Sequence, residues 1–141
     1  MDTQHGTAKA VFDFTSIQAG AWPQLMRVTR DGRRLSVSMN QAGRIAMFDI
    51  SDPEQPRLLK ALDLGQGSGP HYIALTEDEK RLAISDHFLN EDNFGKVHAV
   101  GDHEIHLVKV MKDDLVLDSK FDLSTPALPT GPARPPGIAI K

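Results

Sequence analysis

The sequence predicts an all-β fold: a partial β-propeller of about two four-stranded antiparallel blades with flanking strands. A strand–turn–strand unit occurs twice, at Trp22–Ser38 and Gly69–Ser85, and the copies align without a gap at the 47-residue offset between Pro23 and Pro70. A third copy begins at Arg134. Strand repeats spaced by roughly 40–50 residues, without intervening helices, are typical of propeller blades.

The chain before the first repeat, residues 1–19, is predicted to be a tail that includes one short strand. Val11, Phe12 and Phe14 make Lys9–Ile17 β-prone. We expect this run to be the outer strand of a preceding blade.

Blade one is predicted to occupy residues 20–66. Gly32 in Arg30–Arg33 supplies the positive φ of a hairpin turn. Neither proline in Ser51–Pro56 can donate a ladder hydrogen bond, so this segment lies outside the sheet. The predicted strands are Gln24–Thr29, Arg34–Met39, Arg44–Ile50 and Leu58–Leu64.

Blade two is predicted to occupy residues 67–123, with an inserted loop at residues 86–103 where blade one needs only a short turn. Loops of this length inside a compact domain are usually functional or disordered. Residues 124–141 are expected to be a proline-rich connection and the start of a further inner strand. The predicted strands of blade two are Tyr72–Thr76, Arg81–Ser85, Glu104–Met111 and Leu115–Phe121.

Histidines follow the strand ends of blade two. His71 begins the first strand, His87 follows the second and His103 precedes the third. In antiparallel order these positions share one rim, so they are candidate metal ligands. Additional candidates are Asp86, His98 and His106, with carboxylates at Asp102 and Glu104. Nitrogen and oxygen donors without sulfur suit copper, zinc or iron.

Ordinary structural roles remain open for the same residues. His71 can be hydrogen-bonded at the channel mouth, and the loop histidines can be solvated. Trp22 is expected to pack between blades, with ligand contact at the channel mouth as the alternative. Asn90–Gly95 offers oxygen ligands for calcium, but it lacks the spacing of an EF-hand loop, so a solvated turn is the favoured interpretation.

Two segments carry a resemblance to a known family. Phe48–Leu58 contains Asp-Ile-Ser-Asp-Pro-Glu-Gln-Pro, which resembles a turn of β-propellers. Together with Asp31–Ser38, it is similar to blades of the selenium-binding protein family, which includes methanethiol oxidases. Gly69–Leu75 resembles the C-terminal part of bacterial members, so the match is to C-terminal blades.

That resemblance implies a seven-bladed propeller with histidine-bound copper that oxidises a small thiol. Under this interpretation the chain contributes His71, His87 and His103 to the copper site and is inactive in isolation. The first alternative is a non-catalytic propeller piece that serves as an interaction scaffold. A second alternative is a sugar-lactonase-like propeller enzyme, although the acidic and asparagine ligand set that it needs is not visible in the sequence.

Composition excludes several other classes. Sixteen basic and 19 acidic side chains give no sign of a nucleic-acid or membrane partner. The N-terminus lacks the features of a signal peptide, no apolar run is long enough to span a bilayer, and cysteine is absent. A cytoplasmic protein is expected. Because two blades leave sheet faces uncovered, we expect a fragment of a longer chain, self-association or a marginal fold.

Overall fold

The computed structural model contains two four-stranded antiparallel sheets and almost no helix among the residues it describes, which are 6, 8–91, 97–100, 104–121, 127–128, 131–132 and 138–139. The first blade has the strand order β1-β2-β3-β4, and the second has the order β10-β9-β6-β5. This arrangement confirms the predicted all-β fold of partial propeller blades. No helix within these described ranges is long and apolar enough to cross a membrane.

The first blade is formed by four consecutive strands. They are β1 (Pro23–Val28), β2 (Arg34–Met39), β3 (Arg44–Asp49) and β4 (Arg57–Asp63). Each predicted strand of this blade is present, with its ends shifted by at most one residue.

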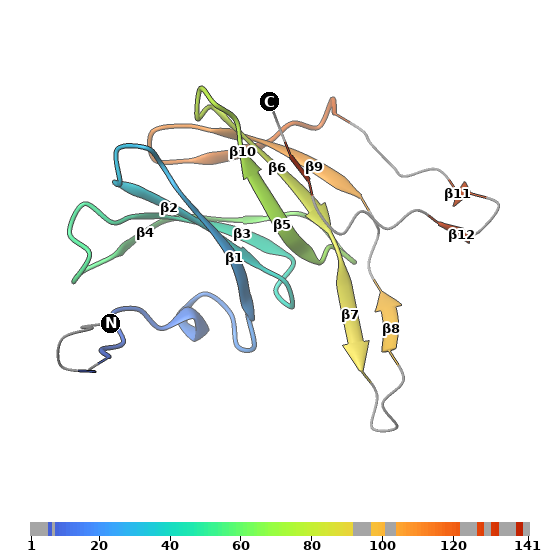
Figure 1. The fold of residues 1–141 in the computed structure, drawn as a ribbon, viewed down its shortest axis with the longest axis horizontal. Helices are drawn as coiled ribbons and strands as arrows, with labels where there is room; N and C mark the ends of the chain where they lie inside the picture. The colour runs from blue at the N-terminus through green and yellow to red at the C-terminus, as the bar shows by residue number, and fades with distance from the viewer. Residues whose placement is uncertain are drawn as a thin grey trace.

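The second blade repeats the plan around an insertion. Its strands are β5 (Pro70–Leu75), β6 (Arg81–Asp86), β9 (Ile105–Val110) and β10 (Leu115–Leu117), so the last strand is shorter than predicted. The inserted segment is not only loop: it contains the hairpin of β7 (Phe88–Glu91) and β8 (Val97–Val100), which projects away from both sheets (Figure 1). A two-residue pair, β11 (Ala127–Leu128) and β12 (Gly131–Pro132), lies in the proline-rich region.

The turns show that the repeat is structural. Thr29 and Asp31 bond to each other in the β1–β2 turn, at 2.7 Å between Oγ1 and Oδ1. Thr76 and Asp78 make the same bond at 2.7 Å in the β5–β6 turn. The hydroxyl bond is the main cause that lowers the pKa of each aspartate, so both carboxylates remain ionised and accept backbone N–H groups.

The two blades pack face to face. Strand β1 lies against β5, and β4 lies against β10, as Figure 1 also shows for β1 and β5. We call the side of each sheet that meets the other blade its shared face. The buried apolar residues between the shared faces are Ile45, Met47, Leu64, Ile73, Leu82, Ile84, Val108 and Leu115.

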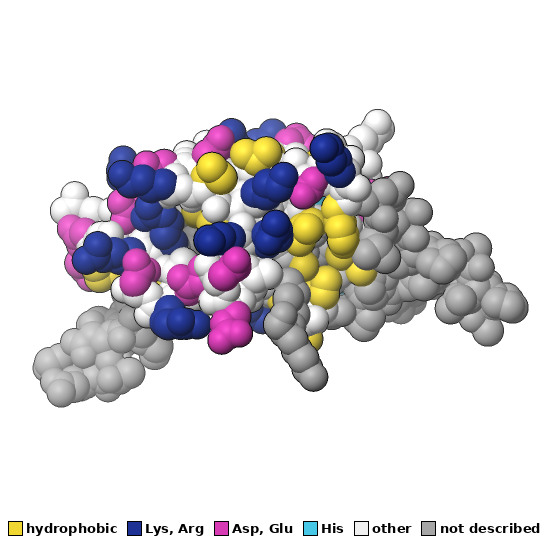
Figure 2. All heavy atoms as spheres, turned by 90° about the horizontal axis from the view of Figure 1, so that it is seen from above, with side chains coloured by type: hydrophobic (Ala, Val, Ile, Leu, Met, Phe, Trp, Pro, Cys, Tyr) yellow, Lys and Arg dark blue, Asp and Glu magenta, His cyan; other side chains and the backbone are white. Residues whose placement is uncertain are grey.

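Ion pairs and hydrogen bonds join the blades at the rim that carries the β1–β2, β5–β6 and β9–β10 turns. Arg34 reaches the carbonyl oxygen of Lys112 at 2.8 Å, and Lys60 Nζ lies 2.9 Å from Asp114 Oδ1. Figure 2 shows basic and acidic side chains interspersed over one face of the molecule. Exposed pairs of this kind contribute little stability each, so the apolar core between the blades dominates.

The expected strand at Lys9–Ile17 is not present. This segment instead forms a loop with a single 3₁₀ turn, η1 (Phe14–Ser16). Asp13 caps the turn, since its carboxylate accepts from the backbone N–H of Thr15 at 2.9 Å. The β-prone pattern was misleading because Phe12 and Phe14 are used for packing on the first blade and not for strand pairing.

Candidate functional site

The rim opposite the turns brings His71 and His87 together. Pro70 pairs with Asp86 in the β5–β6 ladder, so the start of β5 lies beside the end of β6. The backbone N–H of His87 donates to the carbonyl oxygen of Gly69 at 3.0 Å. The two imidazole rings are 5.7 Å apart between centroids and meet edge to face. The predicted juxtaposition of these two histidines is therefore present.

Both imidazoles line a polar hollow of about 180 Å³ between the blades. The full lining is Trp22, Gln24, Asn40, His71 and His87. Gln24 and Asn40 occupy the positions of His71 and His87 one repeat earlier. Sequence reasoning missed these two residues as functional candidates, although the 47-residue offset would have identified them.

Asn40 fixes the wall of the hollow. Its Nδ2 donates to the carbonyl oxygen of Gly69 at 3.0 Å and to that of His87 at 3.2 Å. Because Asn40 directly follows the second strand of the first blade, this amide ties one blade to both histidine-bearing segments of the other. The separation of the hollow's two sides is therefore set by direct hydrogen bonds.

The surroundings of His71 favour the neutral form of its imidazole. Burial is the main cause that lowers the pKa of its imidazole, and the nearby His87 lowers it further. Its Nδ1 atom is buried and has no hydrogen-bond partner in the described part of the chain. A neutral imidazole with an unengaged ring nitrogen can accept a hydrogen bond or coordinate a metal, or donate a proton, according to its tautomer.

Trp22 borders the hollow and does not pack between the blades. Its side chain is 57% exposed, and its backbone has φ of 48°, in the left-handed region that a bulky residue rarely adopts. The backbone N–H of Asn40 donates to the carbonyl oxygen of Trp22 at 3.0 Å, which holds this conformation. The alternative expectation, that Trp22 lies where a ligand can reach it, fits this position.

Asp86 and His106 belong to a separate buried cluster. A single carboxylate oxygen, Asp86 Oδ2, lies 2.6 Å from Ser68 Oγ and 3.1 Å from His106 Nε2. It also accepts from the backbone N–H of Gly69 at 3.0 Å. In a nucleophilic triad the serine and the acid contact different imidazole nitrogens. Here Ser68 and Asp86 both contact Nε2 of His106, which does not fit a triad. Because Asp86 also binds Ser68 and Gly69, the cluster anchors the segment that connects the two blades.

The structure describes the other candidate ligands only in part. His103 and Asp102 lie outside the described residues, and so does most of Asn90–Gly95. His98 lies on β8, in the projecting hairpin. Within the part of the chain that the structure describes, no group of three or more histidines, cysteines, aspartates and glutamates could hold a metal ion. The described donors at the hollow are thus two imidazoles with two neighbouring amides.

The sheets and their stacking define the class of protein: the chain consists of blades of a β-propeller. No protein-family model matches the sequence, and no curated protein matches it.

Among solved structures, the chain is similar to a hypothetical selenium-binding protein from Sulfolobus tokodaii, with a TM-score of 0.60 at 16% identity over 73% of this chain. It is also similar to the periplasmic gluconolactonase PpgL of Pseudomonas aeruginosa, with a TM-score of 0.61 at 16% identity over 77% of this chain. The chain spans only about a quarter of each of these structures, 26% and 28% respectively. At this level of identity the likeness concerns the fold.

Proposed function

We propose that this chain supplies two consecutive blades of a larger β-propeller and that the hollow on their rim binds a transition-metal ion, with copper as the first candidate. The observation that carries the proposal is His71 Nδ1, a buried nitrogen without a described partner beside a second imidazole. A buried polar atom without a partner is costly, and a bound ligand offsets that cost.

The imidazole nitrogens at the hollow are suitable ligands for copper, but the described residues supply only two of them. Imidazole nitrogen is a common ligand of copper, zinc and iron. His71 and His87 would supply two such nitrogens, and we propose His103, which lies outside the described residues, as the third. When bound, copper would supply one-electron chemistry, and a small thiol is the substrate that the family resemblance suggests. The residues of this chain would hold the ion and limit access past Trp22.

Copper titration of the purified chain tests this proposal. We expect Cu(II) to bind with nitrogen hyperfine structure in electron paramagnetic resonance spectra. Replacement of either His71 or His87 by alanine should weaken binding at least about tenfold, equivalent to about 1.4 kcal/mol. His106→Asn is unsuitable as a control because His106 is buried in the Asp86 cluster. Gln24→Ala serves better, since it alters the same hollow without removing an imidazole.

A gain-of-function variant sharpens the test. Gln24 lines the hollow at the repeat position of His71, so Gln24→His should add a third imidazole and tighten copper binding. Met111→His adds a histidine at an exposed site on the opposite rim and should leave the affinity unchanged. Equal effects of Gln24→His and Met111→His, or full binding by the His71→Ala variant, would contradict the metal proposal and favour a non-catalytic scaffold.

A further inference from the structure

We call the side of the first blade that faces away from the second blade its outer face. This face has the apolar residues of an interface. Met26, Leu35 and Val37 lie on this face. Their repeat equivalents in the second blade are Ile73, Leu82 and Ile84, respectively. Those three equivalents are completely buried in the core between the blades. The outer face of the first blade therefore repeats the surface by which the second blade binds the first.

The N-terminal segment covers part of this outer face. The Phe12 and Phe14 rings lie 4.8 and 5.7 Å from the Phe48 ring, between centroids, in edge-to-face contacts. Ile17 also packs on this cluster. In the described part of the chain, the exposed pair of Lys9 Nζ and Glu54 Oε2, at 2.9 Å, also links the segment to the blade. Such a pair adds little stability, so the three rings carry most of the attachment.

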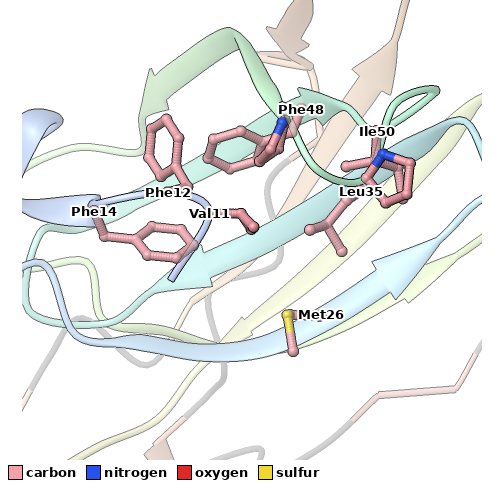
Figure 3. A pocket seen from close by; sticks show the side chains of 9 residues that line it. Val11, Phe12, Phe14, Met26, Leu35, Phe48 and Ile50 are labelled. Carbon is pink, nitrogen blue, oxygen red and sulfur yellow. The ribbon is translucent and has the colours of Figure 1, made fainter. Parts of the chain in front are cut away.

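The cover is incomplete. An apolar hollow of about 280 Å³ remains between the segment and the sheet, and Figure 3 shows Phe12, Phe14 and Phe48 grouped on one side of it, with Leu35 and Ile50 at the other. Met26 is 58% exposed, whereas its equivalent Ile73 is 0% exposed. Exposed apolar surface of this kind commonly marks an interaction site.

The second blade carries the matching residues on its side that faces away from the first blade. Across the existing interface, Ser38 Oγ donates to the carbonyl oxygen of His71 at 2.9 Å. Ser85 is the repeat equivalent of Ser38, and its Oγ is buried without a hydrogen-bond partner in the described part of the chain. Tyr72 and Val116, on the same side of the sheet, are 37% and 44% exposed. This surface thus matches the one with which the first blade receives its neighbour.

We propose that the outer face of the first blade is a docking surface for the second blade of another copy of this chain, and that residues 11–17 are a cap that the second copy displaces. The inference rests on the proposed role of the chain as two consecutive blades. The contact is heterologous, because the two surfaces that meet differ.

In this contact the Ser85 hydroxyl reaches the carbonyl oxygen of Gln24 in the second copy, which is the repeat equivalent of the His71 carbonyl oxygen. Ser85 is enclosed in the single chain, so this face too must open.

Loosening the cap tests the proposal. The Phe12→Ser/Phe14→Ser variant should show a weight-average mass that rises with concentration above the 15.5 kDa of one chain in light scattering. Adding Met26→Glu should restore the monomer because it places a charge in the interface. Adding Met111→Glu should not, although Met111 is 56% exposed, almost the same as Met26. A monomeric cap variant that retains its β-sheet circular dichroism would overturn the proposal.

Crosslinking of the intact-cap chain keeps the proposal testable if the cap variant does not fold. The chain has no cysteine, so single-cysteine variants report one position each. A mixture of Met26→Cys and Tyr72→Cys chains should give a heterodimer with a short bismaleimide in preference to either homodimer. A Met26→Cys homodimer as the main product, or equal crosslinking to Met111→Cys, would overturn head-to-tail docking. If no heterodimer forms, unchanged copper binding in the same samples would show that docking failed while the metal site remained.

Discussion

Glu79 has a left-handed backbone conformation, and the equivalent position in the first blade is occupied by a glycine. Its φ is 57°, and Gly32, at the same place in the first blade, has φ of 71°. A residue with a Cβ atom pays about 1–2 kcal/mol in this region. Glu79 partly offsets the strain because its carboxylate accepts from the backbone N–H of Arg30 in the other blade.

We therefore expect Glu79→Gly and Glu79→Ala to differ in stability. Both variants lose the bond to Arg30, but only the glycine variant also loses the strain. Glu79→Gly should have a free energy of unfolding about 1 kcal/mol higher than Glu79→Ala. Urea unfolding of the two proteins measures this difference, and equal midpoints would show that the turn relaxes around alanine.

The end of β2 controls how the two blades meet, because Asn40 connects it to the start of β5 and the end of β6. Asn40→Ala leaves the carbonyl oxygens of Gly69 and His87 without their side-chain donor in a largely buried site. We expect a loss of about 1–3 kcal/mol in the free energy of unfolding. The neighbouring exposed residue supplies the control: Gln41→Ala should change stability little. If both substitutions had the same effect, the amide bonds would not be what joins the blades here.

The strands could be predicted because each is bounded by a turn with its own chemistry. Gly32, Asp31 and Pro53 mark breaks that only a few backbone conformations satisfy, and the repeat fixes which runs correspond. The rim position of His71 and His87 followed from antiparallel order alone. These features depend on local sequence and on topology.

Other features depend on contacts between distant segments and could not be predicted. Phe12 and Phe14 alternate as in a strand, but they pack on Phe48 from a loop. The sequence makes His106 a candidate ligand, but it does not reveal that Ser68 lies beside His106 and Asp86. The sequence also favours a position between the blades for Trp22, but its positive φ turns it to the surface.

The described chain should unfold as one unit despite containing two sheets. Residues from both blades form the same buried core, so neither shared face can be exposed without the other. Ile84→Ala in the second blade should lower stability by about 2–5 kcal/mol. Fluorescence of Trp22, beside the first blade, should shift to the same new midpoint as far-ultraviolet circular dichroism. Separate midpoints for the two signals would indicate independent blades.

The like orientation of the two repeats has a consequence for ring size. The two sides of each blade differ, so copies of the chain can join only head to tail. Each added copy brings its two four-stranded sheets. A closed ring made only of this chain would contain an even number of blades, and within the usual range of about 4–8 that means two, three or four copies. A ring with an odd number would require at least one sheet from a different source.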